Sequence, residues 1–185
     1  ILGSLNLTGT ILDIGIYSTR LYAGSTGNSN ELNIVDISNP SSLSLITTYN
    51  AAGSQDGSAI SLFGTTLVLG RTNGSDPEIN IFDVTNASPV LLGTAQTSGS
   101  VLSLSRLDNT TLEVGTSESG AEYQRFDISV TSSPVMISSM DLSGDGVGIV
   151  ENTSLVVLAT NSTTQALQII GPLSLPDFSR EAIFT

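Results

Sequence analysis

Apolar residues along this chain occur in short runs that either alternate with polar positions or continue for about four to six residues. Clusters of Gly, Asn, Ser, Asp and Pro separate the runs, and such clusters are typical of turns. No window sustains the i, i+3, i+4, i+7 spacing of an amphipathic helix over three turns. The pattern therefore predicts an all-β chain built from short strands.

The runs repeat at intervals of about 45 residues, which is the first feature to seek in a chain of short strands. Three sets of residues follow this period independently, so coincidence is a poor explanation. The sets are the runs Leu21–Gly24, Leu67–Gly70, Leu112–Gly115 and Leu155–Leu158; the acids Asp36, Asp83 and Asp127, with Gly171 in the fourth place; and the glycines Gly9, Gly53, Gly99 and Gly144.

Each repeat contains four apolar runs, which in the second repeat are Ser58–Phe63, Thr66–Arg71, Glu78–Val84 and Pro89–Thr97. Four strands in about 45 residues are the signature of a propeller blade, a four-stranded antiparallel sheet packed against its neighbours. We therefore expect a single β-propeller-type repeat domain over residues 1–185, with four four-stranded blade units and one extra N-terminal strand. The units span residues 10–53, 54–99, 100–144 and 145–185, and the extra strand spans residues 1–9.

The extra strand follows from the phase of the repeat. Leu2–Gly9 aligns with the fourth run Leu92–Gly99, yet Pro176–Phe184 also aligns as the fourth run of the last unit. Seventeen strand-like segments result, one more than four blades need. Three explanations stay open: the chain is part of a longer propeller, it closes as a four-bladed ring with a spare strand, or the spare strand pairs with a neighbouring subunit.

The segment Leu32–Pro40, with the sequence LNIVDISNP, resembles the core of the LVIVD repeat. The resemblance continues more weakly in Ile79–Pro89 and Tyr123–Pro134, and Gly171 departs from it. LVIVD repeats occur in bacterial and archaeal surface proteins and are taken to form β-propellers, so the resemblance implies that fold and location. The family is named for a repeat and implies no catalytic residues.

The recurring polar residues have a structural interpretation. Asp36, Asp83 and Asp127 each close a third strand before a turn, where the carboxylate can accept backbone N–H bonds. The recurring Gly9, Gly53, Gly99 and Gly144 are expected to supply turns with positive φ between units. Because the fourth unit has Leu158 where the others have glycine, we expect one hairpin to pack differently.

Composition narrows the chemistry, since the chain has no Cys and no His, and its five basic residues are all arginine. The absence of His, Cys and Lys excludes a Ser-His-Asp relay, a thiol nucleophile, a Schiff-base lysine and a structural zinc site of the usual ligands. We expect no enzymatic activity, no cofactor and no metal. The arginines are Arg20, Arg71, Arg106, Arg125 and Arg180.

A net charge of −12 repels nucleic acids and anionic membranes. Charged residues make up only 12% of the chain, so its polar surface is mainly Ser, Thr, Asn and Gly, as is common outside cells. No apolar stretch approaches the length of a membrane span, and the absence of an initiator Met suggests a processed product. Six Asn-x-Ser/Thr sequons, which are candidate glycosylation sites, also favour an extracellular or cell-surface location. They begin at Asn6, Asn73, Asn86, Asn109, Asn152 and Asn161.

Carboxylate chemistry is the one enzymatic class that the composition leaves open, as in glycosidases of propeller architecture. Acids in or near the first run of each unit are its candidates, although they do not recur at one position. Residues 73–78 form a candidate calcium loop, but they lack the regular ligand spacing of such loops. Glu118 and Glu122 flank a hairpin tip, where we expect them to be solvated. The candidate acids are Asp13, Asp56, Asp108, Asp145 and Glu151.

These patterns together predict a non-enzymatic extracellular surface protein with a structural or interaction role in assembly or adhesion. Its expected partner is itself, as an oligomer or filament formed by strand pairing between subunits, or another surface component. The alternatives are a carbohydrate- or peptide-binding propeller and a carboxylate-dependent glycan hydrolase or lyase.

Overall fold

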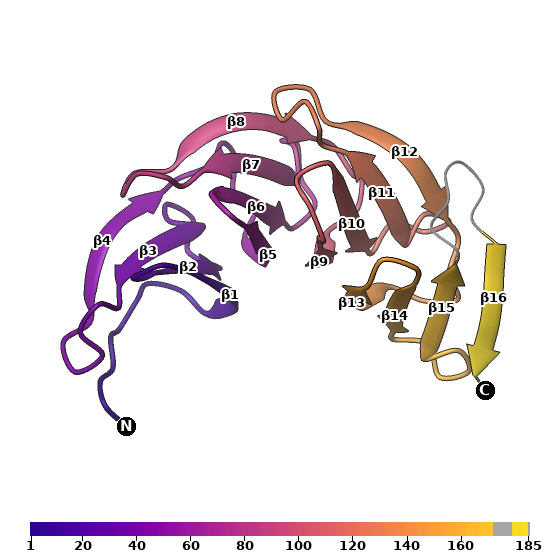
Figure 1. Cartoon of the computed structure of the whole chain (residues 1–185), viewed down its shortest axis with the longest axis horizontal. Helices are drawn as coiled ribbons and strands as arrows, with labels where there is room; N and C mark the ends of the chain where they lie inside the picture. Colours follow the sequence, from indigo (N-terminus) through magenta and orange to yellow (C-terminus); the bar gives the residue numbers. More distant parts are fainter. Residues whose placement is uncertain (172–178, 185) are drawn as a thin grey trace.

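The computed structural model describes residues 1–171 and 179–184, which form four antiparallel sheets of four strands each (Figure 1). In every sheet the strands lie in chain order, so each is a simple meander. Sheet 1 comprises β1 (Ile11–Tyr17), β2 (Arg20–Ser25), β3 (Leu32–Asp36) and β4 (Ser44–Tyr49); sheet 2 comprises β5 (Gly57–Phe63), β6 (Thr66–Arg71), β7 (Ile79–Asp83) and β8 (Val90–Ala95).

The second half of the chain repeats this plan, and no described residue lies in an α-helix. Within the described ranges there is accordingly no helix with the length and hydrophobicity to cross a bilayer. Sheet 3 comprises β9 (Val101–Ser105), β10 (Thr111–Thr116), β11 (Tyr123–Asp127) and β12 (Val135–Met140); sheet 4 comprises β13 (Gly146–Glu151), β14 (Val156–Thr160), β15 (Leu167–Gly171) and β16 (Ser179–Phe184).

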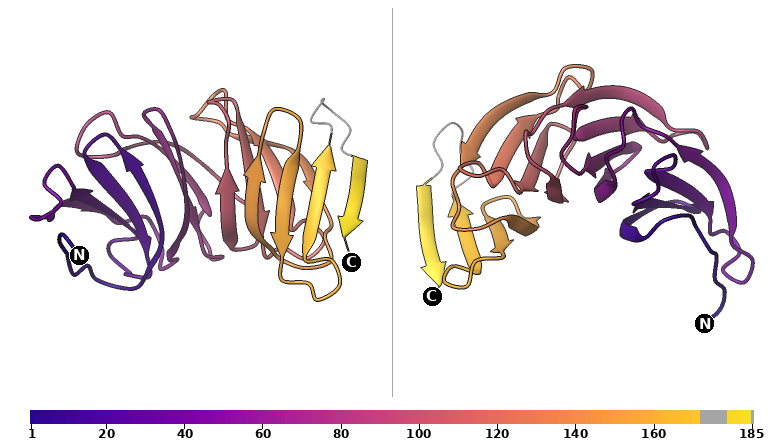
Figure 2. Two further views of the ribbon diagram at one scale, coloured as in Figure 1. Left: turned by 60° about the horizontal axis from the view of Figure 1, so that its bottom comes forward. Right: turned by 180° about the vertical axis from the view of Figure 1, so that it is seen from behind.

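The four sheets are arranged face to face along an open arc (Figures 1 and 2). The first strands β1, β5, β9 and β13 lie on the concave side and contact one another in sequence. The fourth strands lie on the convex side, and sheets 1 and 4 stand at opposite ends of the arc. Of the three explanations left open by the sequence, the closed four-bladed ring does not describe this chain, because its sheets form an open arc.

The strand registers show which residues of the four sheets are equivalent. A register shift follows the first residue of each first strand, and the residues beyond it pair in the same way in all four sheets. One set of equivalent pairs is Ile14 with Ala23, Ile60 with Leu69, Leu104 with Val114, and Ile149 with Leu158.

These registers correct one sequence alignment. Gly148 pairs with Ala159 as Ala59 pairs with Gly70, so the fourth-unit counterpart of Gly70 is Ala159 and not Leu158. Leu158 is fully buried like Leu69, its true equivalent. The hairpin of the fourth unit thus pairs like the others, and the residue that replaces its glycine is Ala159, one position beyond Leu158.

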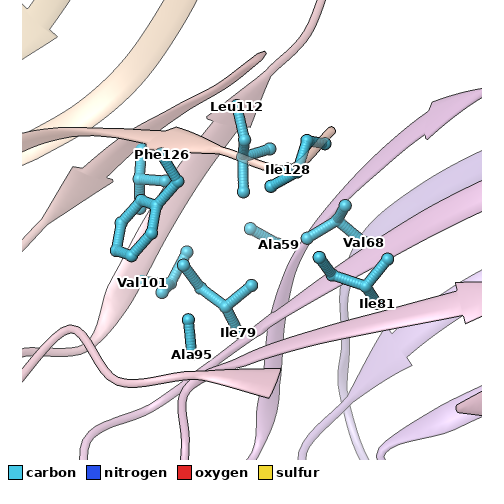
Figure 3. Close-up of a cluster of buried hydrophobic side chains, with 10 residues drawn as sticks. Ala59, Val68, Ile79, Ile81, Ala95, Val101, Leu112, Phe126 and Ile128 are labelled. Carbon is cyan, nitrogen blue, oxygen red and sulfur yellow. The ribbon is translucent and has the colours of Figure 1, made fainter. Parts of the chain in front are cut away.

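Apolar side chains fill the spaces between successive sheets. Between sheets 2 and 3, β-branched and aromatic residues of both faces interdigitate (Figure 3). Burial of this kind, at roughly 25 cal/mol per Å² of apolar surface, is the main stabilising contribution to stacked sheets. The labelled members of this cluster are Ala59, Val68, Ile79, Ile81, Ala95, Val101, Leu112, Phe126 and Ile128.

The predicted extra strand at Leu2–Gly9 does not form, since residues 1–7 have no strand structure. A β-strand needs a neighbour for its backbone N–H and C=O groups, and all four sheets already have four strands. Of the predicted last run, Pro176–Phe184, β16 covers Ser179–Phe184, whereas residues 172–178 and Thr185 lie outside the described residues.

Candidate functional site

A polar triad interrupts the apolar stacking between sheets 3 and 4. The face of each sheet that looks toward the next has three equivalent central positions, two on its third strand and one on its second. Sheets 1, 2 and 4 fill them with apolar or aromatic residues, whereas sheet 3 has a glutamate, a tyrosine and an arginine. The sets are Tyr22, Leu32 and Ile34; Val68, Ile79 and Ile81; Glu113, Tyr123 and Arg125; and Val157, Leu167 and Ile169.

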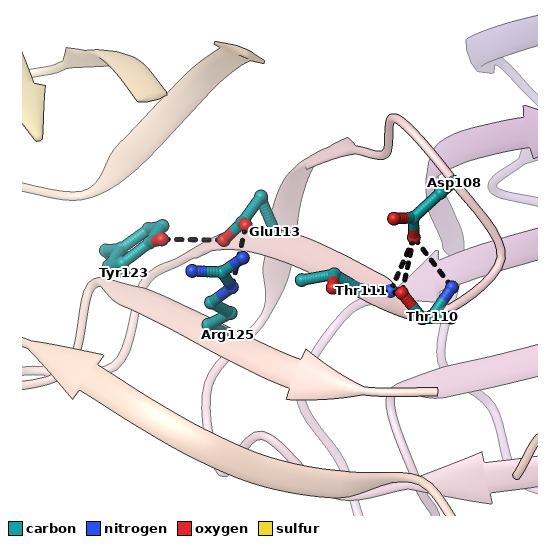
Figure 4. A network of polar contacts seen from close by, with 6 residues as sticks. All are labelled: Asp108, Thr110, Thr111, Glu113, Tyr123 and Arg125. Atoms are coloured by element: carbon teal, nitrogen blue, oxygen red, sulfur yellow. Dashed lines mark hydrogen bonds and ion pairs between the residues drawn. The ribbon is translucent and has the colours of Figure 1, made fainter. Parts of the chain in front are cut away.

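The triad is closely coupled (Figure 4). The hydroxyl of Tyr123 donates a 2.6 Å hydrogen bond to Oε2 of Glu113, and Nε of Arg125 lies 3.0 Å from Oε1 of the same carboxylate. Glu113 and Tyr123 are fully buried and Arg125 is nearly so. The carboxylate is thus held on both oxygens by groups of its own sheet, which is how buried charges are usually compensated.

Burial has a large effect on the acidity of this cluster. It raises the pKa of Glu113 to about 7, and the hydrogen bond from Tyr123 and the charge of Arg125 only partly oppose the shift. Burial also raises the pKa of Tyr123, and the adjacent Glu113 carboxylate adds to the increase. The pKa of Glu151, on the facing strand β13, is raised by burial as well.

A cavity of about 350 Å³ opens beside the triad, at the end of the sheets where β9 and β13 finish. Arg125 and Glu151 form its deeper wall, and the β9–β10 and β13–β14 hairpins form its rim. At the rim, Asp108 accepts hydrogen bonds from Thr110 and Thr111, which lower its pKa against the opposing effect of burial. The lining residues are Leu107, Asp108, Thr111, Arg125, Glu151, Asn152 and Thr153.

Of the acids that the sequence nominated, the structure brings only Asp108 and Glu151 together. Asp13 lies between sheets 1 and 2, where its Oδ2 accepts the N–H of Ile60 at 2.7 Å. Asp56 and Asp145 precede β5 and β13 at the opposite end of the first strands, and Asp145 accepts a 2.8 Å bond from the side chain of Asn161.

The sequence patterns did not point to Glu113, Tyr123 and Arg125 as a polar site. A signal was available, because the three residues occupy positions at which the other three repeats have apolar or aromatic side chains. The cavity therefore lies where the repeat pattern is broken.

Three buried glutamates form a second recurring feature, at the residue before each of the first three third strands. Glu31 accepts the N–H of Ala51 at 2.9 Å and Glu78 accepts that of Thr97 at 2.9 Å. Glu122 accepts the N–H of Leu142 at 2.8 Å. The expectation that Glu122 is solvated is wrong, because its carboxylate fixes the backbone that leaves the fourth strand.

The recurring aspartates bond within the turns that follow them. Oδ1 of Asp36, Asp83 and Asp127 accepts the backbone N–H two residues ahead, at 2.8 Å in each case. These hydrogen bonds lower the pKa of all three carboxyls. The three aspartates are therefore engaged with the backbone of their own turns.

The recurring glycines serve two different needs. Gly9 and Gly53 have φ values of 81° and 85°, a region that favours glycine. Positive φ is not found at Gly99 and Gly144, so the expectation was wrong there. Close approach explains the absence of a side chain instead, because a Cβ would lie 2.5 Å from the Glu118 nitrogen at Gly99 and 2.6 Å from Oδ1 of Asn161 at Gly144.

Arginines connect neighbouring sheets through backbone carbonyls. Arg20 donates from sheet 1 to the carbonyls of Val84, Thr85 and Asn86 in sheet 2. Arg106 donates from sheet 3 to the Thr66 carbonyl at 2.6 Å, and burial lowers its pKa to about 10.

Two further sets of sequence candidates lie at the surface or in loops. The asparagines of all six sequons are exposed. In the candidate calcium loop, the Glu78 carboxylate points inward to Thr97, and among the described residues no group of three or more acidic side chains could hold a metal ion.

The fold defines a class, the repeat proteins built from stacked four-stranded antiparallel sheets. Within the chain, residues 26–51 match the LVIVD repeat family, as the motif in Leu32–Pro40 indicated. No curated protein sequence matches the chain.

Solved structures share the repeat, β-propeller-like fold. A protein from Lactobacillus plantarum superposes with a TM-score of 0.78 at 14% identity, covering 98% of this chain and 57% of its own. The computationally designed Ika4 protein superposes with a TM-score of 0.69 at 11% sequence identity, and the match covers 90% of this chain and 94% of the Ika4 chain. The computationally designed Ika8 protein superposes with a TM-score of 0.66 at 12% sequence identity, and the match covers 91% of this chain and 48% of the Ika8 chain. This chain thus spans about half of two of these relatives and nearly all of the third, and at these identities the likeness concerns the fold alone.

Proposed function

We propose that the chain is a blade array of an extracellular β-propeller-type surface protein and acts as a non-enzymatic structural or interaction module. The LVIVD match and the stacked sheets support the propeller assignment. A surface with few charges and six exposed sequons supports an extracellular setting. Its partner is a second copy or another surface component with the same kind of sheet.

The observation that carries this proposal is the pair of unmatched apolar faces at the ends of the arc. Ile14 on sheet 1 is 56% exposed, whereas its equivalent Ile60 is 8% exposed because sheet 1 covers it. At the other end, Leu167 is 42% exposed, whereas its equivalent Ile79 is fully buried under sheet 3. Contiguous apolar surface of this kind marks interaction sites.

Electron microscopy of the purified chain, combined with light scattering, tests the proposal. We expect rings or filaments for the full chain and their loss when residues Ile1–Thr8 are deleted. Unchanged assemblies after the deletion would reject strand pairing between subunits. A chain that stays monomeric at every concentration would reject self-association and leave another surface component as the only partner proposed.

The cavity between sheets 3 and 4 supports a second candidate, the binding of a carbohydrate. Hydroxyl-rich ligands suit a site that combines the carboxylates of Asp108 and Glu151 with the guanidinium of Arg125. Titration with soluble oligosaccharides tests it: Glu151→Gln should weaken binding, whereas Asp141→Asn, a change on the exposed surface, should not. Cleavage of the oligosaccharide that is lost in Glu151→Gln and Asp108→Asn would instead assign a glycan hydrolase or lyase.

A further inference from the structure

The first nine residues lie where the fourth strand of a preceding sheet would lie. A Cβ on Gly93 of β8 would approach the Thr131 carbonyl of sheet 3 to 2.0 Å, and a Cβ on Gly3 would approach the Pro40 carbonyl of sheet 1 to 2.2 Å. Pro40 and Thr131 are equivalent, each four residues beyond the aspartate that ends its third strand. Gly3 therefore contacts the β3–β4 connection of sheet 1 in the same way as Gly93 of β8 contacts the β11–β12 connection of sheet 3.

A second contact repeats the same correspondence. A Cβ on Gly99 would meet the backbone of Glu118, and one on Gly9 would meet the backbone of Gly27, its equivalent in sheet 1. The segment from Gly3 to Gly9 thus follows the path of an outer strand at both ends. Among the described residues, no inner strand pairs with this segment.

The end faces of the arc supply the apolar surface for such inner strands. Ile14 and Ile16 occupy the positions at which Ile60 and Leu62 pack on sheet 1. Val157 and Leu167 of sheet 4 are equivalent to Val68 and Ile79 of sheet 2, which pack against sheet 3. The free face of sheet 4 is hollowed by a largely apolar cavity of about 200 Å³, and both free faces look toward the open side of the arc (Figure 1).

We infer that these features form a strand-exchange contact with a second copy of this chain, which deepens the assembly role proposed above and depends on it. Ile1–Leu5 of one copy pairs with β15 of the other, and Ile14 and Ile16 of the first copy pack on Val157 and Leu167 of the second. The register of β7 with β8, in which Ile79 pairs with Ala95, places Leu5 beside Leu167. In the single chain Leu167 pairs with Phe184, so the incoming strand takes the place of β16.

The exchange conserves backbone hydrogen bonds, because one antiparallel strand on β15 replaces another. Its driving force is the burial of the two apolar faces, which remain exposed in the single chain. Each copy has one donor end and one acceptor end, so the contact is heterologous and closes into a ring or continues as a filament.

Disulfide trapping tests the contact cleanly because the chain contains no cysteine. A Leu5→Cys chain is mixed with a Leu167→Cys chain under mild oxidation, and a covalent heterodimer is expected on a non-reducing gel. Leu92→Cys, exposed on β8, replaces Leu5→Cys in the control and should give only collisional background. Adding Ile14→Ser and Ile16→Ser to the Leu5→Cys chain should abolish the heterodimer.

The outcomes separate this inference from the wider proposal. If the wild-type chain associates but Leu5 and Leu167 cross-link no better than the control pair, the assembly role stands and strand exchange is wrong. If cross-linking survives the serine changes at Ile14 and Ile16, the assigned packing is wrong. A wild-type chain that never associates with itself would reject both strand exchange and self-assembly.

Discussion

Glu113 shows how one residue can change the character of a repeat. At the equivalent position sheet 2 has Val68, whose burial needs no partner, whereas Glu113 needs both Tyr123 and Arg125 to compensate its polar atoms. Because the pKa of Glu113 is raised from 4.5 to about 7, the folded chain retains a proton between these two pH values that the unfolded chain has released. This carboxyl therefore stabilises the fold in its protonated form.

The stability of the chain should depend on the protonation of Glu113. Its contribution is fully present below the ordinary pKa of 4.5 and is lost as the pH rises through the folded value of about 7. The loss amounts to at most about 3 kcal/mol in the free energy of unfolding. Urea unfolding at about pH 5 and about pH 8 should show this fall in the wild type and a smaller one in Glu113→Gln. Equal pH dependence in both chains would contradict the assignment.

The buried glutamates before the third strands should matter far more than surface acids. Glu78→Ala leaves the N–H of Thr97 and the amide of Gln96 without their acceptor. The cost should be about 2 kcal/mol, as for other buried hydrogen bonds to charged groups. Asp141→Asn, an exposed change, should stay within about 0.5 kcal/mol. Thermal unfolding of both variants measures the contrast, and similar melting temperatures would show that Glu78 is dispensable.

Each sheet is stable because its neighbours cover its apolar faces. The same position on the first strand is buried in sheet 2 and open in sheet 1. This pair separates the effect of stacking from the effect of residue type, since both positions are isoleucine and both lie in equivalent strands.

Ile60→Ala should lower the free energy of unfolding by about 3 kcal/mol, because it leaves a cavity between sheets 1 and 2. Ile14→Ala should cost about 0.5 kcal/mol in the monomer, because its side chain is already half in water. Denaturant titration at low protein concentration compares the two. An equal loss would mean that stacking on sheet 1 contributes nothing at Ile60.

The strands and their sheets were predictable from the sequence because apolar periodicity and turn residues are local signals. The predicted run Thr66–Arg71 matches β6, and Ser58–Phe63 lies within β5. The strand predicted at Leu2–Gly9 did not form, because pairing depends on a neighbour that sequence alone does not supply. The triad around Glu113 was missed because its contacts join two strands, β10 and β11, and so depend on a strand pairing that the spacing of single residues does not give.

The whole arc has a strong negative charge, so its assembly should respond to salt in a particular way. Two copies with a net charge of −12 each repel one another, while the proposed contact is apolar. Raising the NaCl concentration from about 0.01 M to about 1 M shortens the Debye length from about 30 Å to about 3 Å and should strengthen association. Sedimentation velocity measures the shift, and weaker association in high salt would indicate a contact held by ion pairs.

The central claim is that an open arc of four sheets joins a second copy through its uncovered ends. Size-exclusion chromatography with light scattering, over a wide range of protein concentrations, measures this directly. We expect a mass of at least twice the 19.1 kDa of the chain at high concentration, and its reduction to the monomer by Ile14→Ser with Ile16→Ser. A mass of one chain at every concentration would contradict the account.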